Sequence, residues 1–286
     1  MHRLVSCFLL TGILLVAVAG SASASFHFMQ IEQVIGSVNG DPTAQAIQLR
    51  MRSGFQNQMQ LSRLRVVDAT GNNPIMIIDM TTSVPNSAAG SRVLITSPNF
   101  ANYTSPAAAP DFVMTNLIPE SYLAAGSLLF ESDTGIIYWR LSWGGAGYTG
   151  SNTGSTTNDA NGNFGPPFAS ALPSPGLSAL RFNGPSNALS TTNAADYSIT
   201  VSAATFNNNA NAAFAVVPDA CDGLAGDMDE DTCLTGLDLQ AFTDCVLSGS
   251  AGTTACDCAD VNSDSALTLD DVDQMVDDLL GAPACP

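Results

Sequence analysis

The sequence predicts a multidomain protein, in which an all-β sandwich is followed by a small α-helical domain. Residues 25–216 alternate short apolar or β-branched runs with clusters of Gly, Asn, Ser, Thr and Pro, as strands joined by turns do. All cysteines except Cys7 lie after residue 220. Sixteen of the 26 acidic residues, and no basic residue, lie from Val217 onward. The composition therefore changes where we expect the boundary between two domains.

Residues 1–24 have the features of an export signal. Arg3 precedes an apolar run from Leu4 to Ala19, and the small residues Ala22-Ser23-Ala24 form a site of the kind that signal peptidase cuts. A membrane anchor is the alternative, but the run is short for a bilayer span and no stop-transfer pattern follows it. We expect a secreted protein that begins near Ser25 and has no membrane span after cleavage.

The body, residues 25–216, contains short runs with the length and alternation of strands. These runs span residues 26–36, 44–53, 62–69, 74–80, 92–97, 127–132, 135–143, 196–206 and 212–217. In the second run Ile47, Leu49 and Met51 fall on one face, because strand side chains alternate. Gln48, Arg50 and Arg52 fall on the other. This pattern predicts one core face and one solvent-exposed face, within a single two-sheet core.

The run 135–143 carries both tryptophans, and two interpretations are open. Trp139 and Trp143 lie on one strand face, where an exposed pair could stack on sugar rings and bind a carbohydrate. Large aromatic side chains in strands more often belong to the core, which is the interpretation we favour. The polar stretch 144–170 is long for a connection in a compact domain, which indicates a binding loop or a mobile excursion.

Several classes of catalytic site are excluded in the body. The chain contains no lysine, and His27 is the only histidine after the predicted cleavage. There can be no phosphate-binding GKS or GKT loop and no Schiff-base lysine, and the body has no cysteine for a Cys–His pair. A carboxylate pair remains, for which Glu131 and Asp133 are the fallback candidates, since they lie two apart beside an aromatic strand. We expect a non-catalytic body.

Part of the body resembles lamin-tail domains, which are small immunoglobulin-like sandwiches appended to many exported bacterial proteins. The resemblance rests on residues 30–53, on "LSRLRVVDATGN" at 61–72 and on "LIPESYLAAGSLLFE" at 117–131. The sequence departs from that pattern at residues 46–49, where Ala-Ile-Gln-Leu stands in place of Trp-Ile-Glu-Leu. The resemblance implies an immunoglobulin-type sandwich and carries over no catalytic residue.

The C-terminal segment contains two copies of one acidic pattern, at residues 227–238 and 260–271. In EF-hand loops, calcium is bound by a shell made only of oxygen atoms. The side chains at loop positions 1, 3, 5 and 12 and the backbone carbonyl at position 7 supply them. The candidate ligands are the side chains of Asp227, Asp229, Asp231 and Asp238 with the carbonyl of Cys233 in the first loop, and the side chains of Asp260, Asn262, Asp264 and Asp271 with the carbonyl of Ala266 in the second. The spacing predicts two calcium sites.

Each loop is followed by an amphipathic helix pattern. Leu239, Phe242 and Val246 recur as Val272, Met275 and Leu279, with the spacing that one helical face requires. The glycine-rich residues before each loop are unsuited to an entering helix, so only the exiting helix is expected. A solvated or disordered acidic tail is the alternative. The repetition in register, with Leu234 and Leu267 at position 8 of both loops, favours a folded domain.

Two repeats of a loop and an exit helix resemble a type I dockerin domain, over residues 227–283, joined to the body by a linker at 217–226. The resemblance implies two bound calcium ions and docking onto a cohesin-like domain of a partner protein through loop positions 10 and 11. Those positions are Gly236, Leu237, Leu269 and Asp270, which differ from the Ser/Thr pairs usual there. The glycine usual at position 6 is replaced by Thr232 and Ser265, which is expected to weaken calcium binding.

The six cysteines of the C-terminal segment predict a disulfide framework. Zinc is the alternative, but the segment has no histidine and no pair of CxxC motifs. Because the ends of dockerin domains lie close together, the resemblance favours a bond between Cys221 and Cys285. Cys245 is then expected to pair with Cys256 or Cys258.

These observations predict a secreted, non-catalytic binding or scaffolding protein, in which a dockerin-like calcium module attaches a β sandwich to a cohesin-like partner. The alternatives are a secreted polysaccharide-active enzyme and a carbohydrate-binding module, either of which would carry the dockerin. A polysaccharide is thus a possible further partner. Nucleic acid is excluded as an expected partner, because the formal net charge of −18 repels phosphate backbones.

Overall fold

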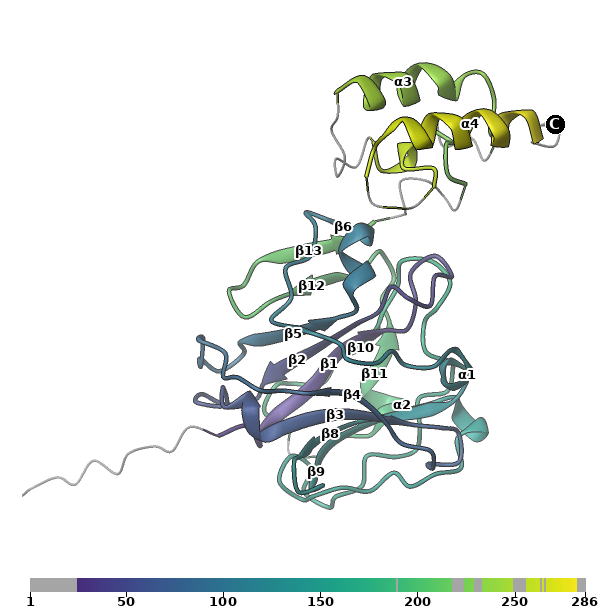
Figure 1. The fold of residues 1–286 in the computed structure, drawn as a ribbon. Helices are drawn as coiled ribbons and strands as arrows, with labels where there is room; N and C mark the ends of the chain where they lie inside the picture. Colours follow the sequence, from purple (N-terminus) through teal and green to yellow (C-terminus); the bar gives the residue numbers. More distant parts are fainter. Residues whose placement is uncertain are drawn as a thin grey trace, which may run out of the picture.

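The computed structural model describes residues 25–188, 190–217, 224–228, 233–248, 256–262, 264 and 266–281. The predicted signal peptide and most of the predicted linker lie outside these ranges. Within them the chain is mostly β-sheet with few helices, as predicted (Figure 1). None of the helices in the described part of the chain has the length and hydrophobicity that crossing a bilayer requires.

The strands of the body form three sheets, with a six-stranded central sheet between the other two (Figure 1). The central sheet has the order β11 (Tyr197–Ile199), β10 (Leu180–Phe182), β1 (Met29–Ile35), β2 (Ala46–Met51), β5 (Arg92–Thr96) and β7 (Phe112–Val113). The four-stranded sheet has the order β4 (Ile75–Asp79), β3 (Ser62–Val67), β8 (Gly126–Ser132) and β9 (Ile137–Trp143). The three-stranded sheet has the order β12 (Thr205–Asn207), β13 (Ala213–Val216) and β6 (Thr104–Ser105). β5 and β7 pair in parallel.

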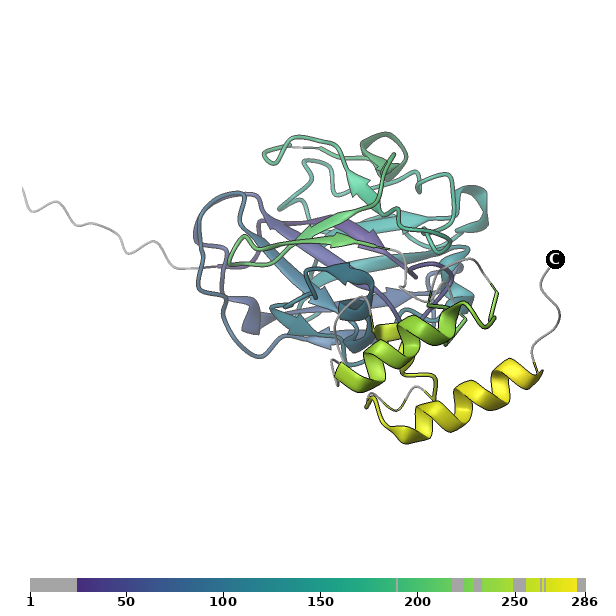
Figure 2. The same ribbon diagram turned by 90° about the horizontal axis from the view of Figure 1, so that it is seen from above.

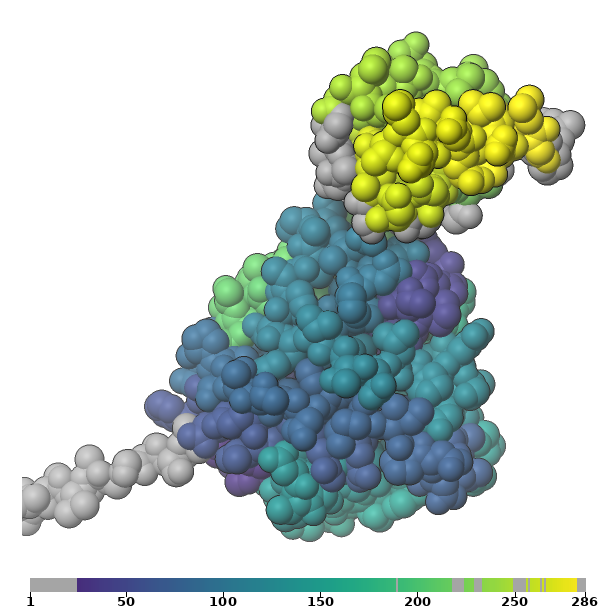
Figure 3. Space-filling view, in the orientation of Figure 1, coloured from purple at the N-terminus to yellow at the C-terminus, as the bar shows by residue number. Residues whose placement is uncertain are grey.

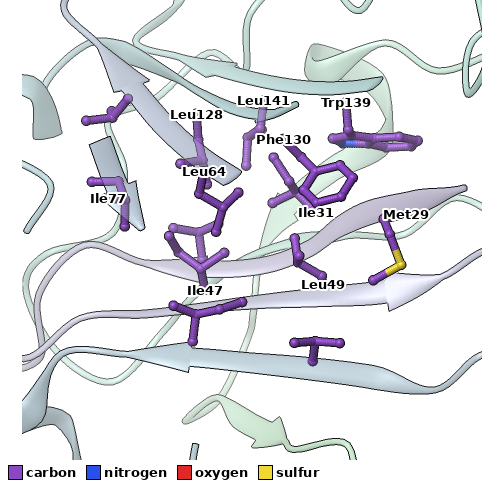
Figure 4. Close-up of a cluster of buried hydrophobic side chains, with 14 of the residues drawn as sticks. Met29, Ile31, Ile47, Leu49, Leu64, Ile77, Leu128, Phe130, Trp139 and Leu141 are labelled. Carbon is purple, nitrogen blue, oxygen red and sulfur yellow. The ribbon is translucent and has the colours of Figure 1, made fainter. Parts of the chain in front are cut away.

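The larger hydrophobic core lies between the central and the four-stranded sheets (Figure 4). Ile47, Leu49 and Met51 of β2 are fully buried in it, as their alternation predicts. Trp139 and Trp143 of β9 are also 0% exposed there, so the core interpretation of the two tryptophans is confirmed. Each large apolar side chain that is fully buried contributes about 1.5–3 kcal/mol of transfer free energy. Neither indole is available as a platform for a sugar ring.

The three-stranded sheet covers part of the opposite face of the central sheet, so the prediction of a solvent-exposed face is wrong at Gln48, whereas Arg50 and Arg52 are partly exposed. Leu94 packs in a second core with Phe214 of the three-stranded sheet. Gln48, expected in solvent, is only 3% exposed. Its Nε2 donates to Glu32 at 2.8 Å and its Oε1 accepts from the backbone N–H of Asn207. A buried amide of this kind is tolerated because its hydrogen bonds are made inside the protein.

A bulge in β1 supplies a buried charge to the same face. The pairing of β1 with β2 shifts between Ile31 and Gln33, which leaves Glu32 as the extra residue. The carboxylate of Glu32 is buried and accepts from Nη1 of Arg50 at 3.1 Å and from Nε of Arg92 at 2.8 Å. Since a bulge re-aims a side chain, this irregularity lets one carboxylate join β1, β2 and β5.

One predicted strand is divided in the structure, and three short strands were not predicted. The run 196–206, predicted as one strand, forms β11 in the central sheet and β12 in the three-stranded sheet. Strand β10 lies in a segment for which no strand was predicted, and it pairs antiparallel with β1. The short strands β6 and β7 were not predicted either. Between β11 and β12 the chain therefore crosses from the central sheet to the three-stranded sheet, where the sequence indicates one continuous strand.

The polar stretch 144–170 packs onto the body rather than extending from it. Phe164 is fully buried, with its ring centroid 5.5 Å from that of Trp139. Nδ2 of Asn158 donates to the backbone carbonyl of Met29 at 3.0 Å, which attaches the stretch to β1. The stretch also covers Arg140 of β9, whose Nε donates to a carbonyl of the stretch at 2.9 Å. The interpretation as a mobile excursion is therefore not supported.

The C-terminal segment holds the two longest helices of the described residues, α3 (Asp238–Ser248) and α4 (Leu269–Gly281), which lie side by side (Figures 1 and 2). They share a hydrophobic cluster that contains no residue of the body. In the ribbon view this segment lies at the end of the body where β6 and β13 are labelled (Figure 1), and the space-filling view in the same orientation shows it as a separate lobe (Figure 3). The other helices are α1 (Glu120–Leu123) and α2 (Asn193–Asp196) and the 3-10 turns Met59–Leu61, Pro98–Tyr103, Gly145–Gly147 and Asp257–Ala259.

Candidate metal centre

The predicted exit helices are present directly after the two acidic loops. Phe242 of α3 and Met275 of α4 are buried in the shared cluster, and Val246, Val272 and Leu279 pack against it. Leu239, predicted on the inner face of α3, is instead 41% exposed. The inward face of α3 is centred on Phe242 and Cys245, and Leu239 lies at its margin because successive residues turn by about 100°.

The acids at loop position 12 make the same contacts with the threonine at position 9 in both loops. Oδ2 of Asp238 accepts from the backbone N–H of Thr235 at 2.8 Å, and Oδ2 of Asp271 accepts from that of Thr268 at 2.7 Å. The hydroxyl of each threonine lies 3.4 Å from the same oxygen. Both aspartates are 0% exposed. The duplicated sequence therefore folds into duplicated geometry at the residue that completes each loop.

The second oxygen of each of these carboxylates faces the beginning of its loop. Oδ1 of Asp238 accepts from the backbone N–H of Met228 at 2.8 Å, and Oδ1 of Asp271 accepts from that of Asn262 at 3.3 Å. A carboxylate at position 12 thus holds the two ends of its loop together. The closure brings the first ligand positions near the last, as a metal loop requires.

In the second loop, the other candidate side chains accept hydrogen bonds from the loop backbone. Oδ1 of Asp260 and Oδ1 of Asn262 both accept from the N–H of Asp264, at 3.0 and 2.9 Å. Oδ1 of Asp264 accepts from the N–H of Ala266 at 2.9 Å. The backbone therefore turns around the side-chain oxygens. Ala266, whose carbonyl is the predicted ligand at position 7, is exposed.

In the first loop Asp227, at position 1, is 0% exposed, whereas Asp229 and Asp231 lie outside the described residues. Cys233, at position 7, is disulfide-bonded. The glycine before this loop is needed for packing. Gly226 has φ +87°, and a Cβ there would lie 2.7 Å from the sulfur of Met275. Over the described residues, no group of three or more His, Cys, Asp and Glu side chains lies close enough to hold a metal ion.

The charge of the C-terminal segment fits a cation. Asp227, Asp238 and Asp271 are each 0% exposed, and the sequence has no basic residue from Val217 onward. Burying a carboxylate is costly unless hydrogen bonds and a positive charge compensate it. Backbone N–H groups supply the hydrogen bonds to Asp238 and Asp271 but no full charge. A hard divalent cation with oxygen ligands, such as calcium, would supply it.

The four residues predicted to face a partner are all on the surface. Gly236 and Asp270 are exposed, and Leu237 and Leu269 are 73% and 76% exposed. Val276 and Leu280 are also exposed on α4, seven and eleven residues after Leu269, and this spacing places the three on one helical face. These three exposed residues lie about a quarter turn around α4 from the cluster residues Val272, Met275 and Leu279, and they form an apolar surface that the domain's own core does not use.

The fallback catalytic acids have different environments. Glu131 is 0% exposed and pairs with Nε of Arg63 at 2.5 Å and Nε of Arg65 at 2.7 Å. Asp133 is exposed in the turn after β8. A pair of carboxylates acting on a glycosidic bond must face one cleft. Glu131 instead serves as the counter-ion of two arginines on β3.

The disulfide that joins Cys245 of α3 to Cys256 spans a Cα–Cα distance of 5.3 Å and is one of the two alternatives predicted for Cys245. Cys233 and Cys258 are also disulfide-bonded. The predicted pair of Cys221 and Cys285 lies outside the described residues. The disulfide at Cys245 connects α3 to the residues that begin the second repeat, so it constrains the two loops relative to each other.

No protein-family model and no curated protein matches this chain. The threonines at position 9, Thr235 and Thr268, were not among the predicted site residues, although they repeat in register with the acids they contact. Their recurrence at the same offset is the sequence signal that would have found them. Threonine suits the position because both its N–H and its hydroxyl reach the carboxylate at position 12.

Proposed function

We propose that the protein is a secreted, non-catalytic attachment protein, in which the C-terminal segment binds two calcium ions in a dockerin-like domain. The matched burial and hydrogen bonding of Asp238 and Asp271 is the observation that carries the proposal. An accidental acidic tail would have no reason to bury the same position of both repeats. A solvated tail would also expose its carboxylates to water.

Each calcium ion would take its ligands from one loop. The first ion would be held by Asp227, Asp229, Asp231, Asp238 and the carbonyl of Cys233, and the second by Asp260, Asn262, Asp264, Asp271 and the carbonyl of Ala266. The bound ion would compensate the buried negative charge and so add to the stability of α3 and α4. With Thr232 and Ser265 at position 6, the affinity is expected in the weaker part of the range for such loops.

The attachment surface would be the exposed apolar residues beside the loops. Leu237 and Leu269 lie at the positions through which dockerin domains dock, and they are accessible to a partner. A cohesin-like domain with an apolar surface is the partner that fits them. Calcium would act on docking indirectly, because it orders the loops that carry these leucines.

The body would be the part that is attached. Its central and four-stranded sheets pack face to face over one core, which supports a sandwich of the immunoglobulin or lamin-tail type. The three-stranded sheet is an addition to that architecture. Because Glu131 is fully paired with arginines and Asp133 lies apart in solvent, the environment of these acids favours a binding function over hydrolysis.

The test is a calorimetric titration of the mature full chain with calcium. We expect saturable binding of two ions below about 1 mM, since even weak extracellular calcium loops reach that range. A variant with Asp238→Ala and Asp271→Ala should lose both sites. Asp244→Asn is the matched control, because Asp244 lies on α3 but is exposed and bonded only to Gln240 among the contacts described. Absence of saturable binding, or equal binding by both variants, would overturn the proposal.

A further inference from the structure

A pocket of about 580 Å³ opens on the outer face of the central sheet, beyond the part that the three-stranded sheet covers. It lies where the chain leaves β11 and crosses to β12, and residues 200–205 form one of its walls. Its floor comes from three neighbouring strands. Arg181 of β10 is paired directly with Gln33 of β1 and with Ser198 of β11, so these three side chains share one face.

The pocket has an arginine that can accept an anionic ligand. Arg181 is exposed, and among the described residues it forms no ion pair. A guanidinium group carries five N–H donors in a planar fork that matches a carboxylate or a sulfate. Arg181 is therefore free to bind an oxyanion with two parallel hydrogen bonds.

A second arginine keeps the potential of the pocket positive. Arg50 also lines it, but its guanidinium is fixed by Glu32, by Gln30 and by the carbonyl of Gly184. Glu32 also pairs with Arg92, so one carboxylate serves two guanidinium groups. This arrangement leaves excess positive charge beside the pocket. Arg50 thus acts as a positioned charge, whereas Arg181 is the group that can contact a ligand.

The remaining lining is suited to a hydroxylated ligand. Asn183 and Ser198 place an amide and a hydroxyl group at the pocket, and Nδ2 of Asn183 donates to Oγ of Ser198 at 2.7 Å, which leaves the hydroxyl hydrogen of Ser198 for a ligand. The hydroxyl of Thr200 instead orders the wall, because it accepts from the N–H of Ala179 and donates to the carbonyl of Ser202. Gly184 and Ala203 are small and leave room for a ring to approach the wall. A volume of this size accommodates a ligand of one or two sugar rings.

We propose that this pocket binds an acidic saccharide unit, a sugar that bears a carboxylate or a sulfate, with Arg181 as the main contact to the anionic group. The hydroxyl of Ser198 and the amide of Asn183 favour a sugar over an apolar carboxylic acid. This site is independent of the calcium loops, because no residue of the C-terminal segment lines it. It would give the body a ligand of its own.

The test is a titration of the mature full chain with digalacturonic acid, with a sulfated galactose disaccharide and with neutral digalactose, at low salt. We expect both acidic sugars to bind, or the one whose anion fits, and the neutral sugar to bind at least tenfold more weakly. Affinity should fall as salt rises, because the contact is ionic. Equal binding of the neutral sugar would overturn the proposal, as would absence of binding by either acidic sugar.

Variants locate the site. Arg181→Gln should weaken binding of the acidic sugar about 10-fold to 100-fold, since hydrogen bonds to charged groups are the strong ones. Arg181→Lys, which keeps the charge but loses the fork, should weaken it less. Thr81→Asp changes the net charge equally at an exposed position after β4 and should leave affinity unchanged. Retained affinity in Arg181→Gln would overturn the assignment.

A short peptide with a free C-terminal carboxylate tests a different class of ligand. If it binds more tightly than the acidic sugars, and if amidation of its C-terminus abolishes binding, the pocket binds peptides and the saccharide proposal is overturned.

Discussion

Nε1 of Trp139 donates a hydrogen bond to the hydroxyl of Tyr197 at 2.8 Å, and that hydroxyl donates in turn to the backbone carbonyl of Ile31. The chain connects three strands, because Trp139 lies on β9, Tyr197 on β11 and Ile31 on β1. Burial raises the pKa of Tyr197, so its hydroxyl remains protonated, and a donor, at pH values where an exposed tyrosine ionises. The polar groups of both aromatic side chains are thus satisfied inside the core.

The fluorescence of the two tryptophans should report on the core of the body alone. They are the only tryptophans of the chain, and both are 0% exposed. We expect blue-shifted emission that acrylamide quenches weakly in the folded protein, followed by a red shift and strong quenching in urea. Strong quenching of the folded protein would contradict the buried placement of the indoles. Addition of polysaccharide should leave the folded spectrum unchanged.

Replacing Glu131 by Gln should destabilise the body. Arg63 and Arg65 would lose their shared counter-ion, and their side chains are 21% and 26% exposed, so water would screen part of the loss. We expect a decrease of about 2–3 kcal/mol in the free energy of unfolding, below the usual cost of breaking a fully buried pair. Urea denaturation followed by tryptophan fluorescence measures it.

Asp133→Asn is the control for that experiment, because Asp133 is exposed in the adjacent turn. Its effect on the free energy of unfolding should stay within about 0.5 kcal/mol. Equal effects of the two substitutions would show that the buried ion pairs contribute nothing measurable. Hydrolysis of a polysaccharide by the wild type, lost in both variants, would contradict the non-catalytic interpretation of these acids.

Removing the disulfide between Cys245 and Cys256 should loosen α3 without affecting the body. The bond closes a short loop with a sequence separation of 11, for which loop-closure entropy predicts about 3 kcal/mol. In a variant with both cysteines changed to Ser, amides of α3 should exchange faster with deuterium. The tryptophan unfolding transition should be unchanged, since both indoles lie in the body. Unchanged exchange in α3 would contradict the prediction.

Asp68 should titrate well below an ordinary aspartate. Hydrogen bonds from the hydroxyl of Thr70, from the N–H of Asn72 and from the side chain of Asn73 lower the pKa of Asp68 to about 2. Because the pKa of Asp68 is lower in the folded than in the unfolded state, its ionised carboxylate stabilises the folded state at pH values above the unfolded pKa. This contribution to the free energy of unfolding is lost as pH falls through about 2. NMR titration of the carboxyl measures the midpoint. Thr70→Ala should raise it, and a midpoint near 4 in the wild type would contradict the prediction.

The sequence predicted those features of the fold that depend on residues close together in the chain. The alternation of Ile47, Leu49 and Met51 identified the inner face of β2, because side-chain direction in a strand has a period of two. The repeat at a fixed offset identified both acidic loops and the helices after them. In each case the signal lies within a dozen residues and needs no knowledge of distant neighbours.

The features that sequence reasoning missed depend on distant partners. Gln48 is polar and was expected in solvent, but Glu32 and the backbone of Asn207 satisfy it beneath the third sheet. The run 196–206 looks continuous because nothing within it reveals that its two ends pair with different strands, β10 and β13. Arg181 is an isolated arginine in the sequence, and only the pairing of β10 with β1 places it beside a pocket.

The position of β1 in the central sheet pairs the first strand of the body with a strand from near its end. This strand, at the beginning of the body, pairs on one side with β2 and on the other with β10, about 150 residues later in the sequence. Until residues 180–182 arrive, β1 is an open edge with unpaired backbone groups, of the kind that favours association with another chain. We therefore expect the central sheet to close only when residues 180–182 are available, so that most of the body must be synthesised before this edge is covered.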